Sequence, residues 1–175
     1  MKITIIGNCG CGKTTLAKKI SKKFNIPHIQ LDRFWFESGG LRVKKGDTES
    51  AEKVHNYIRH KVEEFISTDN WVSDGFYSRV QPLIYEKADQ LVFIDIPMWR
   101  RIFNHIYRSF FSERHPELKK IDEFKFIFEI IRRTFLKGPK LRKFIKDNPE
   151  KVKHLRSYKE VDEYLLVLSR CGQKA

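Results

Sequence analysis

The first residues whose types and spacing could carry out chemistry form a glycine-rich run near the N-terminus. The run from Gly7 to Thr14 fits the pattern Gly-x-x-x-x-Gly-Lys-[Ser/Thr] at every fixed position. Glycines let successive backbone N–H groups turn toward one point, which creates a nest for an anion. Lys13 would bring a positive charge to the outer phosphates, and the Thr14 hydroxyl is a ligand for Mg²⁺. The motif therefore predicts that the chain binds ATP, or a close relative of it, together with Mg²⁺.

The residues expected to hold the nucleotide are the motif itself and the threonine after it: Gly7, Asn8, Cys9, Gly10, Cys11, Gly12, Lys13, Thr14 and Thr15. Two cysteines within this run allow other interpretations. A Cys-x-Cys pair without further cysteine or histidine partners nearby is a poor zinc site, so small side chains filling variable loop positions are the simpler interpretation. Cys11 also lies near Lys13 and near the start of a helix, and both features favour a thiolate. We therefore expect a reactive Cys11 thiol that bound nucleotide would mask.

Carboxylates follow three other short apolar runs. Asp32, Asp74 and Asp95 each come at the end of a run that is typical of a buried strand. Because Mg²⁺ takes few carboxylates and keeps several waters, Asp74 and Asp95 are alternative metal neighbours on this reasoning. Asp32 could orient or deprotonate an acceptor hydroxyl, or could serve only as a turn or cap residue.

The elements that must position these groups alternate between strand and helix along the chain. The expected strands span residues 2–7, 28–31, 71–73 and 91–96, with a further candidate at 152–155. The expected helices span residues 13–24, 48–67, 99–111, 122–136 and 159–169, with a shorter basic helix after Pro139 and a loop at 38–47. This alternation predicts one α/β domain over residues 1–175 with a mainly parallel five-stranded sheet. Ligands collect at the carboxyl edge of such a sheet, where the motif and the three aspartates would meet.

The charge of the chain is strongly positive and unevenly distributed. The net charge is +13, and residues 98–160 contain 18 Lys and Arg against 8 Asp and Glu. Such a balance attracts polyanions, so this region is either a set of solvated helix faces, an arginine-bearing lid over a triphosphate, or a nonspecific nucleic-acid footprint. No apolar stretch is long enough for a membrane span, and three cysteines do not make a disulfide framework. We expect a cytoplasmic protein without a membrane partner.

Several segments together carry a resemblance to a known family. They are the run at 7–15, Leu31-Asp32 followed by Phe34-Trp35, the run at 71–75 with Tyr77, the run at 91–97 and the run at 155–159. In these segments the chain resembles the adenylate-kinase-like P-loop kinases, most closely the group labelled DNA topology modulation proteins or adenylate-kinase-related kinases. The resemblance implies a three-layer P-loop fold, a helical basic lid at about residues 100–150, and ATP and Mg²⁺ as cofactors.

The resemblance also implies roles for individual residues. It favours Asp74 over Asp95 as the carboxylate that orients Mg²⁺. It places Arg101, Arg108 and Arg114 in the lid, where we choose Arg108 first and Arg114 next as catalytic arginines beside Lys13 and Asp32. The segment from Arg156 to Lys159 resembles the loop that contacts the adenine base. Arg33 and Arg79 could in addition hold an anionic acceptor, since arginine binds phosphate or carboxylate through two hydrogen bonds.

Two functions fit these features. The first is ATP-dependent phosphoryl transfer to a small acceptor, which could be a nucleotide, a nucleoside or another metabolite. The alternative is a nucleic-acid-associated ATP-binding protein that modulates DNA topology or expression. A cluster of aromatic residues in the basic region bears on this choice, because it could pack a helix against the core or stack on single-stranded bases. Phe124 and Phe128 fit a helix face that points to the core, and Phe126 falls off that face. We favour core packing for the cluster, which also contains Phe135.

Overall fold

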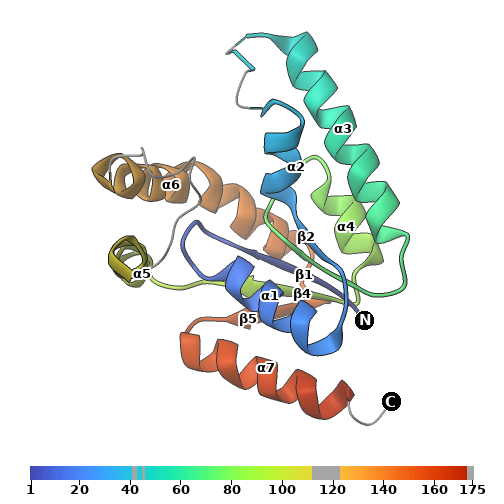
Figure 1. Cartoon of the computed structure of the whole chain (residues 1–175), viewed down its shortest axis with the longest axis vertical. Coiled ribbons are helices and arrows are strands. Elements are labelled where there is room, and N and C mark those ends of the chain that lie inside the picture. Colours follow the sequence, from blue (N-terminus) through green and yellow to red (C-terminus); the bar gives the residue numbers. More distant parts are fainter. Residues whose placement is uncertain (41–42, 45, 112–122, 173–175) are drawn as a thin grey trace.

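The computed structural model of the chain describes residues 1–40, 43–44, 46–111 and 123–172 (Figure 1). Five parallel strands form one sheet in the order β2-β3-β1-β4-β5. The strands are β1 (Lys2–Gly7), β2 (His28–Gln30), β3 (Trp71–Asp74), β4 (Gln90–Ile94) and β5 (Val152–Leu155). The predicted α/β class with a parallel five-stranded sheet is confirmed.

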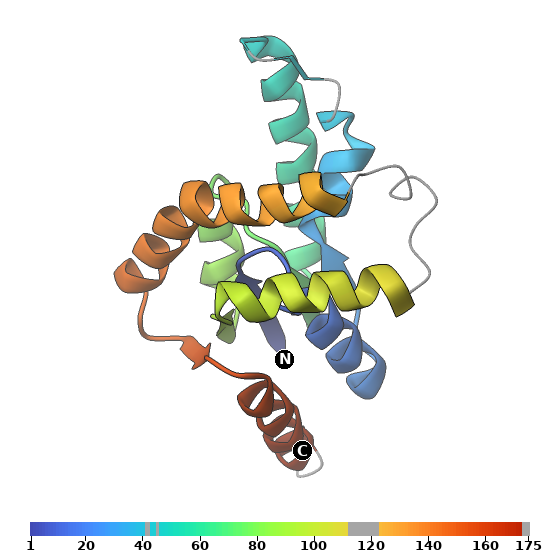
Figure 2. The ribbon, with the colours of Figure 1, turned by 90° about the vertical axis from the view of Figure 1, so that its left-hand side faces the viewer.

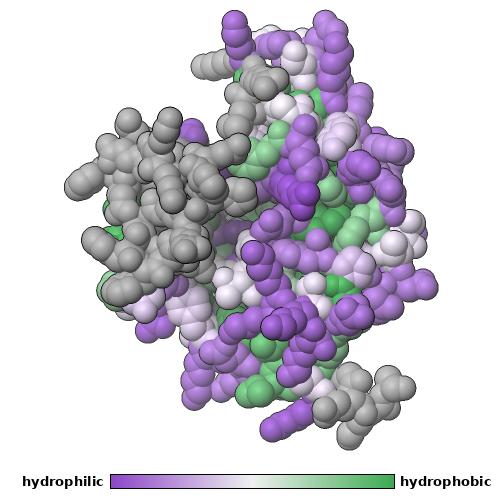
Figure 3. All heavy atoms as spheres, in the orientation of Figure 1, coloured by the Kyte–Doolittle hydropathy of each residue, from purple (hydrophilic) through white to green (hydrophobic). Residues whose placement is uncertain are grey.

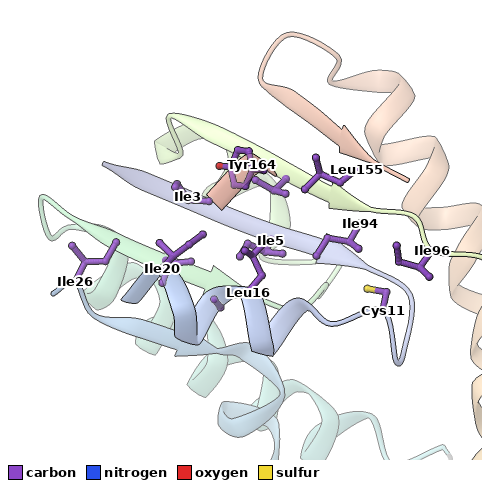
Figure 4. Packing of buried hydrophobic residues seen from close by; sticks show 13 residues of the cluster. Ile3, Ile5, Cys11, Leu16, Ile20, Ile26, Ile94, Ile96, Leu155 and Tyr164 are labelled. Carbon is purple, nitrogen blue, oxygen red and sulfur yellow. The ribbon is translucent and has the colours of Figure 1, made fainter. Parts of the chain in front are cut away.

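Helices cover both faces of this sheet, as the short apolar strands require. They are α1 (Lys13–Phe24), α2 (Leu31–Glu37), α3 (Thr48–Ile66), α4 (Gln81–Lys87), α5 (Met98–Phe111), α6 (Glu123–Asp147) and α7 (Tyr158–Gly172). On one face, Ile3 and Ile5 pack against Leu16 and Ile20 of α1 and Tyr164 of α7 (Figure 4). On the other face, apolar residues of β2, β3 and β4 pack against α3, α4 and the second half of α6. The result is the expected three-layer arrangement.

The strand register determines which residues meet at the carboxyl edge of the sheet. Ile5 on β1 lies opposite Asp74 on β3, and Gly7 at the end of β1 lies opposite Ile94 on β4. The glycine-rich loop therefore leaves the sheet between the ends of β3 and β4. Residues that are 60 or more positions apart in the sequence become neighbours there.

Two elements differ from the sequence-based expectation near the start of the chain. The second strand ends at Gln30, and Leu31 begins the short helix α2, so Asp32 lies in the first turn of a helix and not at the end of a strand. The fully buried Leu31 side chain makes this turn possible, because it anchors the helix start in the core. The seven-residue helix α4 was not predicted, since it is too short to show a helical period.

The basic region forms two helices, α5 and α6, which lie next to each other with the β1–α1 loop behind them (Figure 2). We expected a separate helix after Pro139, but α6 continues through this residue to Asp147, and its axis bends along its length. The core face of α6 contains Ile130, Gly138 and Leu141.

Two of the four residues of the aromatic cluster, for which we favoured core packing, are instead on the surface. Phe128 is 66% exposed and Phe135 is 70% exposed, so core packing was the wrong interpretation for both. Their positions face away from Ile130, which takes the buried stripe of this helix. The side chains of Phe124 and Phe126 lie outside those that the structure describes.

Hydrophilic side chains cover much of the face seen in Figure 3, with hydrophobic patches between them. Among the described residues, no helix is long and apolar enough to cross a membrane.

Candidate functional site

The glycine-rich loop connects β1 to α1 and curls around a point at the carboxyl edge of the sheet. Gly10 and Gly12 have φ angles of +80° and +96°, in the left-handed region that glycine adopts without strain. The Gly12 carbonyl accepts the N–H of Leu16 at 3.0 Å and so starts α1. The first N–H groups of α1 and the turning backbone before them converge, which is the arrangement that binds phosphate.

Lys13 folds back across this loop. Its Nζ donates a hydrogen bond to the carbonyl oxygen of Asn8 at 3.0 Å. Burial acts to lower the pKa of Lys13, but the neighbouring cysteines, once deprotonated, and the carboxylates of Asp32 and Asp74 outweigh burial and hold its pKa above the usual value. The side chain therefore stays positively charged at neutral pH, as the contact with a polyphosphate requires.

Thr14 and Asp74 form a polar pair beside the loop. The Thr14 hydroxyl donates to Oδ2 of Asp74, and Nε2 of His28 lies 3.0 Å from Oδ1 of the same carboxylate. Asp74 is buried, with only 5% of its side chain exposed. One hydroxyl and one carboxylate are hard oxygen donors in the small number that Mg²⁺ takes from protein. The Thr14–Asp74 pair therefore fits Mg²⁺. The contact of His28 with Asp74 was not predicted from the sequence.

Asp95, the alternative carboxylate, faces another strand. Its N–H donates to the Leu155 carbonyl at 2.8 Å, and its Oδ2 lies 3.4 Å from Nε2 of His154 on β5. The geometry thus places Asp74, and not Asp95, against Thr14.

Asp32 and the two candidate acceptor arginines lie on the other side of the loop. Asp32 is exposed in the first turn of α2. Burial, and then the Asp32 charge, raise the pKa of Tyr77, which places this carboxylate within electrostatic reach of Tyr77. Arg33 pairs with Glu37 at 2.7 Å and Arg79 pairs with Glu52 at 3.0 Å, both in exposed positions. Exposed pairs of this kind contribute about 0–1 kcal/mol, so an anionic ligand could replace either carboxylate.

The expectation of a reactive Cys11 thiolate is wrong. The Cys11 side chain is 1% exposed and packs with Ile94 and Ile96 in the core below the loop (Figure 4). Burial raises the pKa of its thiol, and this effect exceeds the opposing influence of Lys13. Cys11 can therefore serve nucleotide binding only through its backbone, while Cys9 is half-buried.

The structure describes only one of the three arginine side chains that were predicted to lie in the lid. Arg101, in the first turn of α5, is buried beneath the loop and donates to the Cys9 carbonyl at 3.1 Å, so it is not a mobile lid residue. Arg108 is on α5, but its side chain lies outside those that the structure describes. Arg114 lies outside the described residues.

A cavity of about 210 Å³ opens beside the start of α1. It is lined on the loop side by Gly12 and Thr15, and on the other side by Asn104 of α5 and Tyr158 of α7. The Asn104 side-chain amide donates to the Tyr158 hydroxyl, which joins the two helices across the cavity. Arg156, the residue predicted here, is exposed and its N–H donates to Glu160 at 2.9 Å. Of the predicted segment, Tyr158 lines the cavity together with Asn104 of α5, and Arg156 does not.

A parallel sheet with this strand order, and a Gly-x-x-x-x-Gly-Lys-Thr loop between β1 and α1, define a P-loop protein of the α/β class. The family model described as an AAA domain matches residues 6–105, more than half of the chain, and the chain belongs to this family.

Curated relatives and a solved structure agree with this assignment. The chain is 32% identical over 81 residues to an adenylate kinase of Wigglesworthia glossinidia brevipalpis, which covers 43% of this chain and 39% of that protein. It is 37% identical over 70 residues to a shikimate kinase of Bacteroides thetaiotaomicron, which covers 37% of this chain and 39% of that protein. The chain thus spans about two fifths of the length of these curated relatives.

The crystal structure of shikimate kinase from Bacteroides thetaiotaomicron superposes with a TM-score of 0.62 at 18% identity. The superposition covers 99% of this chain and 98% of the other, which confirms the fold. Together with the two curated relatives, it confirms the predicted resemblance to adenylate-kinase-like P-loop kinases.

Proposed function

We propose that the chain is an ATP-dependent kinase that transfers the terminal phosphoryl group to a small acceptor. The observation that carries this proposal is the meeting of Lys13, Thr14 and Asp74 at one edge of the sheet. Lys13 and Thr14 come from the loop after β1, and Asp74 comes from the end of β3, 60 residues further along the chain. A positive charge, a hydroxyl and a buried carboxylate around an anion nest are the groups that Mg-nucleotide chemistry needs.

In this proposal the loop N–H groups and Lys13 hold the phosphates, and Thr14 and Asp74 would hold Mg²⁺. The ion, when bound, neutralises charge on the outer phosphates. Asp32 orients the acceptor hydroxyl and takes its proton as the new O–P bond forms and the bond from the γ-phosphorus to the bridging oxygen breaks. Arg108 and Arg114 would stabilise the charge that develops on the transferred group. ADP and the phosphorylated acceptor are the products.

The cavity beside α1 would hold the base. It is lined by Thr15 and Tyr158 and lies next to the N-terminus of α1, where the phosphates would end. Its volume of about 210 Å³ is below the range typical of drug-sized ligands, which suits one planar ring system. The sequence contains no Asn-Lys-x-Asp guanine-reading tetrapeptide, so we favour adenine. Because ATP is the expected substrate, we also propose a cytoplasmic location.

The acceptor class is open between a nucleotide, a nucleoside and another metabolite. The two curated relatives are named for different acceptors, an adenylate and shikimate. In this chain Arg33 and Arg79 flank the region next to Asp32, and both carry exposed carboxylate partners that an anionic acceptor could replace.

The test is release of ADP from Mg-ATP in the presence of a panel of nucleoside monophosphates, nucleosides and other metabolites. Lys13→Ala removes the phosphate contact, and Lys18→Ala is the matched control, since Lys18 is exposed on the same helix. Acceptor-dependent turnover that Lys13→Ala abolishes and Lys18→Ala retains would establish the kinase. ATP binding without turnover on any acceptor would count against it.

A second function, nucleic-acid association, draws support from the outer face of α5. Trp99, Phe103 and Tyr107 follow one another at four-residue spacing and are 65%, 64% and 56% exposed. The Arg100 guanidinium lies 5.0 Å from the centre of the Trp99 ring. Exposed aromatic rings among basic residues are suited to stacking on single-stranded bases. If the double variant Trp99→Ala/Phe103→Ala binds single-stranded DNA as tightly as the wild type at raised salt, this second function is wrong.

A further inference from the structure

Arg101 is buried directly beneath the glycine-rich loop, where the kinase chemistry proposed above gives it no role. Its side chain is 2% exposed, and its guanidinium makes three hydrogen bonds. Nε donates to the Ile96 carbonyl at 3.0 Å, and Nη1 donates to the Cys9 carbonyl at 3.1 Å and to the Thr134 hydroxyl at 3.0 Å. All three of these acceptors are neutral oxygens, and the carboxylate of Asp95 acts on the guanidinium only through space. Burial lowers the pKa of Arg101, but the ordinary value is so high that the group remains charged.

Burying a charge costs free energy, and neutral acceptors offset that cost only in part. The buried charge of Arg101 beneath the loop therefore indicates a functional role. The nearest feature on the loop side is the peptide group between Cys9 and Gly10, because its carbonyl accepts from Arg101. The Gly10 backbone also lies close to the first carbon of the Arg101 side chain, since a Cβ added at Gly10 would lie 3.4 Å from the Arg101 Cβ.

The geometry of this peptide group transmits the contact to the other side of the loop. A trans peptide is planar, and its C=O and N–H bonds point in opposite directions. The structure has no cis peptide bond among the described residues, so the Gly10 N–H points away from Arg101. A charged donor on the carbonyl also polarises the peptide and strengthens its N–H as a donor.

We propose that Arg101 is a positioning residue for phosphate binding: by holding the Cys9 carbonyl from beneath the loop, it directs and strengthens the Gly10 N–H as a donor to a bound phosphate. The inference rests on the proposed nucleotide binding and deepens it. Thr134 contributes from α6, because its hydroxyl donates to the Ile130 carbonyl at 2.7 Å and accepts from Arg101. A phosphate bound at the loop would add its negative charge to that of Asp95 near the Arg101 guanidinium.

The experiment compares three variants. Arg101→Met removes the donors and the charge, and Arg101→Lys keeps the charge but donates from a single nitrogen. Arg100→Met is the matched control, because Arg100 is the neighbouring residue, is exposed, and loses the same charge. Each protein is labelled with ¹⁵N-glycine, which gives signals from only nine residues. The Gly10 amide proton shift and the affinity are then measured on titration with inorganic pyrophosphate and with ADP.

In the wild type and in Arg100→Met, we expect the Gly10 amide proton to move strongly downfield as either ligand binds. In Arg101→Met the shift should shrink and ADP binding should weaken by about tenfold, the usual effect of losing a charge-assisted hydrogen bond. Arg101→Lys should recover part of both effects. A purely structural role would lower the melting temperature of Arg101→Met without changing the Gly10 shift.

Equal shifts and affinities in Arg101→Met and Arg100→Met would overturn this inference while leaving nucleotide binding intact. If the wild type itself bound neither ligand, the proposed function would fail instead. Should Arg101→Met not fold, Arg101→Gln replaces it, with a smaller loss of the Gly10 shift and of ADP affinity expected, because glutamine carries no charge but keeps an amide donor.

Discussion

His28 on β2 and Asp74 on β3 hold each other in a buried contact, with 3.0 Å between Nε2 and Oδ1. Only 13% of the His28 side chain and 5% of the Asp74 side chain are exposed. The other oxygen of the carboxylate accepts from Thr14. Asp74 is thus fixed from both sides, and His28 decides which oxygen is presented to the loop.

We therefore predict that His28→Phe raises the Mg²⁺ concentration needed for tight ATP binding by roughly tenfold or more, the usual effect of losing a group that orients a metal ligand. His28→Gln should keep most of the wild-type behaviour, because its amide can donate from nearly the same place. ATP binding measured over a Mg²⁺ titration checks both variants. The exposed His60 provides the control through His60→Phe. Identical Mg²⁺ dependence in all variants would show that Asp74 needs no orientation by His28.

The sequence was sufficient to predict those parts of the site that depend on local pattern. The apolar run before Gly7 and the amphipathic run after Lys13 identify the strand and the helix around the loop. The alternation of such runs predicts the parallel sheet, and with it a meeting of the loop with Asp74 or Asp95 at one edge; only the family resemblance favoured Asp74. Each of these inferences needs only the order of the elements.

Contacts set by packing and register could not be predicted in the same way. Arg101 reaches Cys9 across 92 residues, and its burial depends on how α5 lies under the loop. Cys11 was wrongly expected to be reactive, because the sequence shows only the two neighbours that favour a thiolate, Lys13 and the start of α1. The sequence does not show that the Cys11 side chain points into the core, and this burial outweighs the effect of both neighbours.

The burial of Cys11 leads to a prediction on alkylation. We expect an alkylating reagent at pH 8 to modify the half-buried Cys9 at least tenfold faster than Cys11, because the thiolate is the reactive form and burial raises the Cys11 pKa. Mass spectrometry of peptides after timed quenching separates the two sites once each is also replaced singly by serine. Equal rates at Cys9 and Cys11 in the folded protein would contradict the buried position of Cys11.

The same thiol makes stability depend on pH. Its folded pKa lies above the ordinary value of 9.0, so the neutral thiol is favoured in the fold. The contribution of the neutral thiol to the free energy of unfolding is fully present below about pH 9. It is lost as the pH rises toward the folded pKa, with a slope of at most about 1.4 kcal/mol per pH unit. Cys11→Ala should lack this part of the slope. Denaturant unfolding of both proteins between pH 8 and pH 10 measures the difference, and parallel curves would refute it.

The cavity beside α1 allows base and phosphate binding to be separated. Tyr158→Ala removes a wall of the cavity and leaves the loop intact, so we expect ATP to bind about tenfold more weakly while tripolyphosphate binds as in the wild type. Lys13→Ala should weaken both ligands. Calorimetric titration of the two ligands gives the comparison. Equal loss of both ligands in Tyr158→Ala would mean that the cavity is not the base site.

Two glycine-to-alanine changes, one at the end of β1 and one in α6 beside the loop, should differ in their cost. A Cβ at Gly7 would lie 2.5 Å from the Ile94 carbonyl oxygen and 2.8 Å from the Cys11 sulfur, and the carbonyl belongs to the inner strand β4, which cannot move aside cheaply. Gly7→Ala should therefore destabilise the protein by about 1–3 kcal/mol.

Gly138 lies inside α6, where a Cβ would meet Oδ1 of Asn8 at an ordinary contact distance of 3.8 Å. Gly138→Ala should change the stability by less than about 1 kcal/mol, because the better helix propensity of alanine is opposed by the contact of its Cβ with the ring of Pro139, the next residue. Denaturant unfolding of the two variants and the wild type gives both free energies. A loss as large as that of Gly7→Ala would contradict the ordinary contact distance between this position and Asn8.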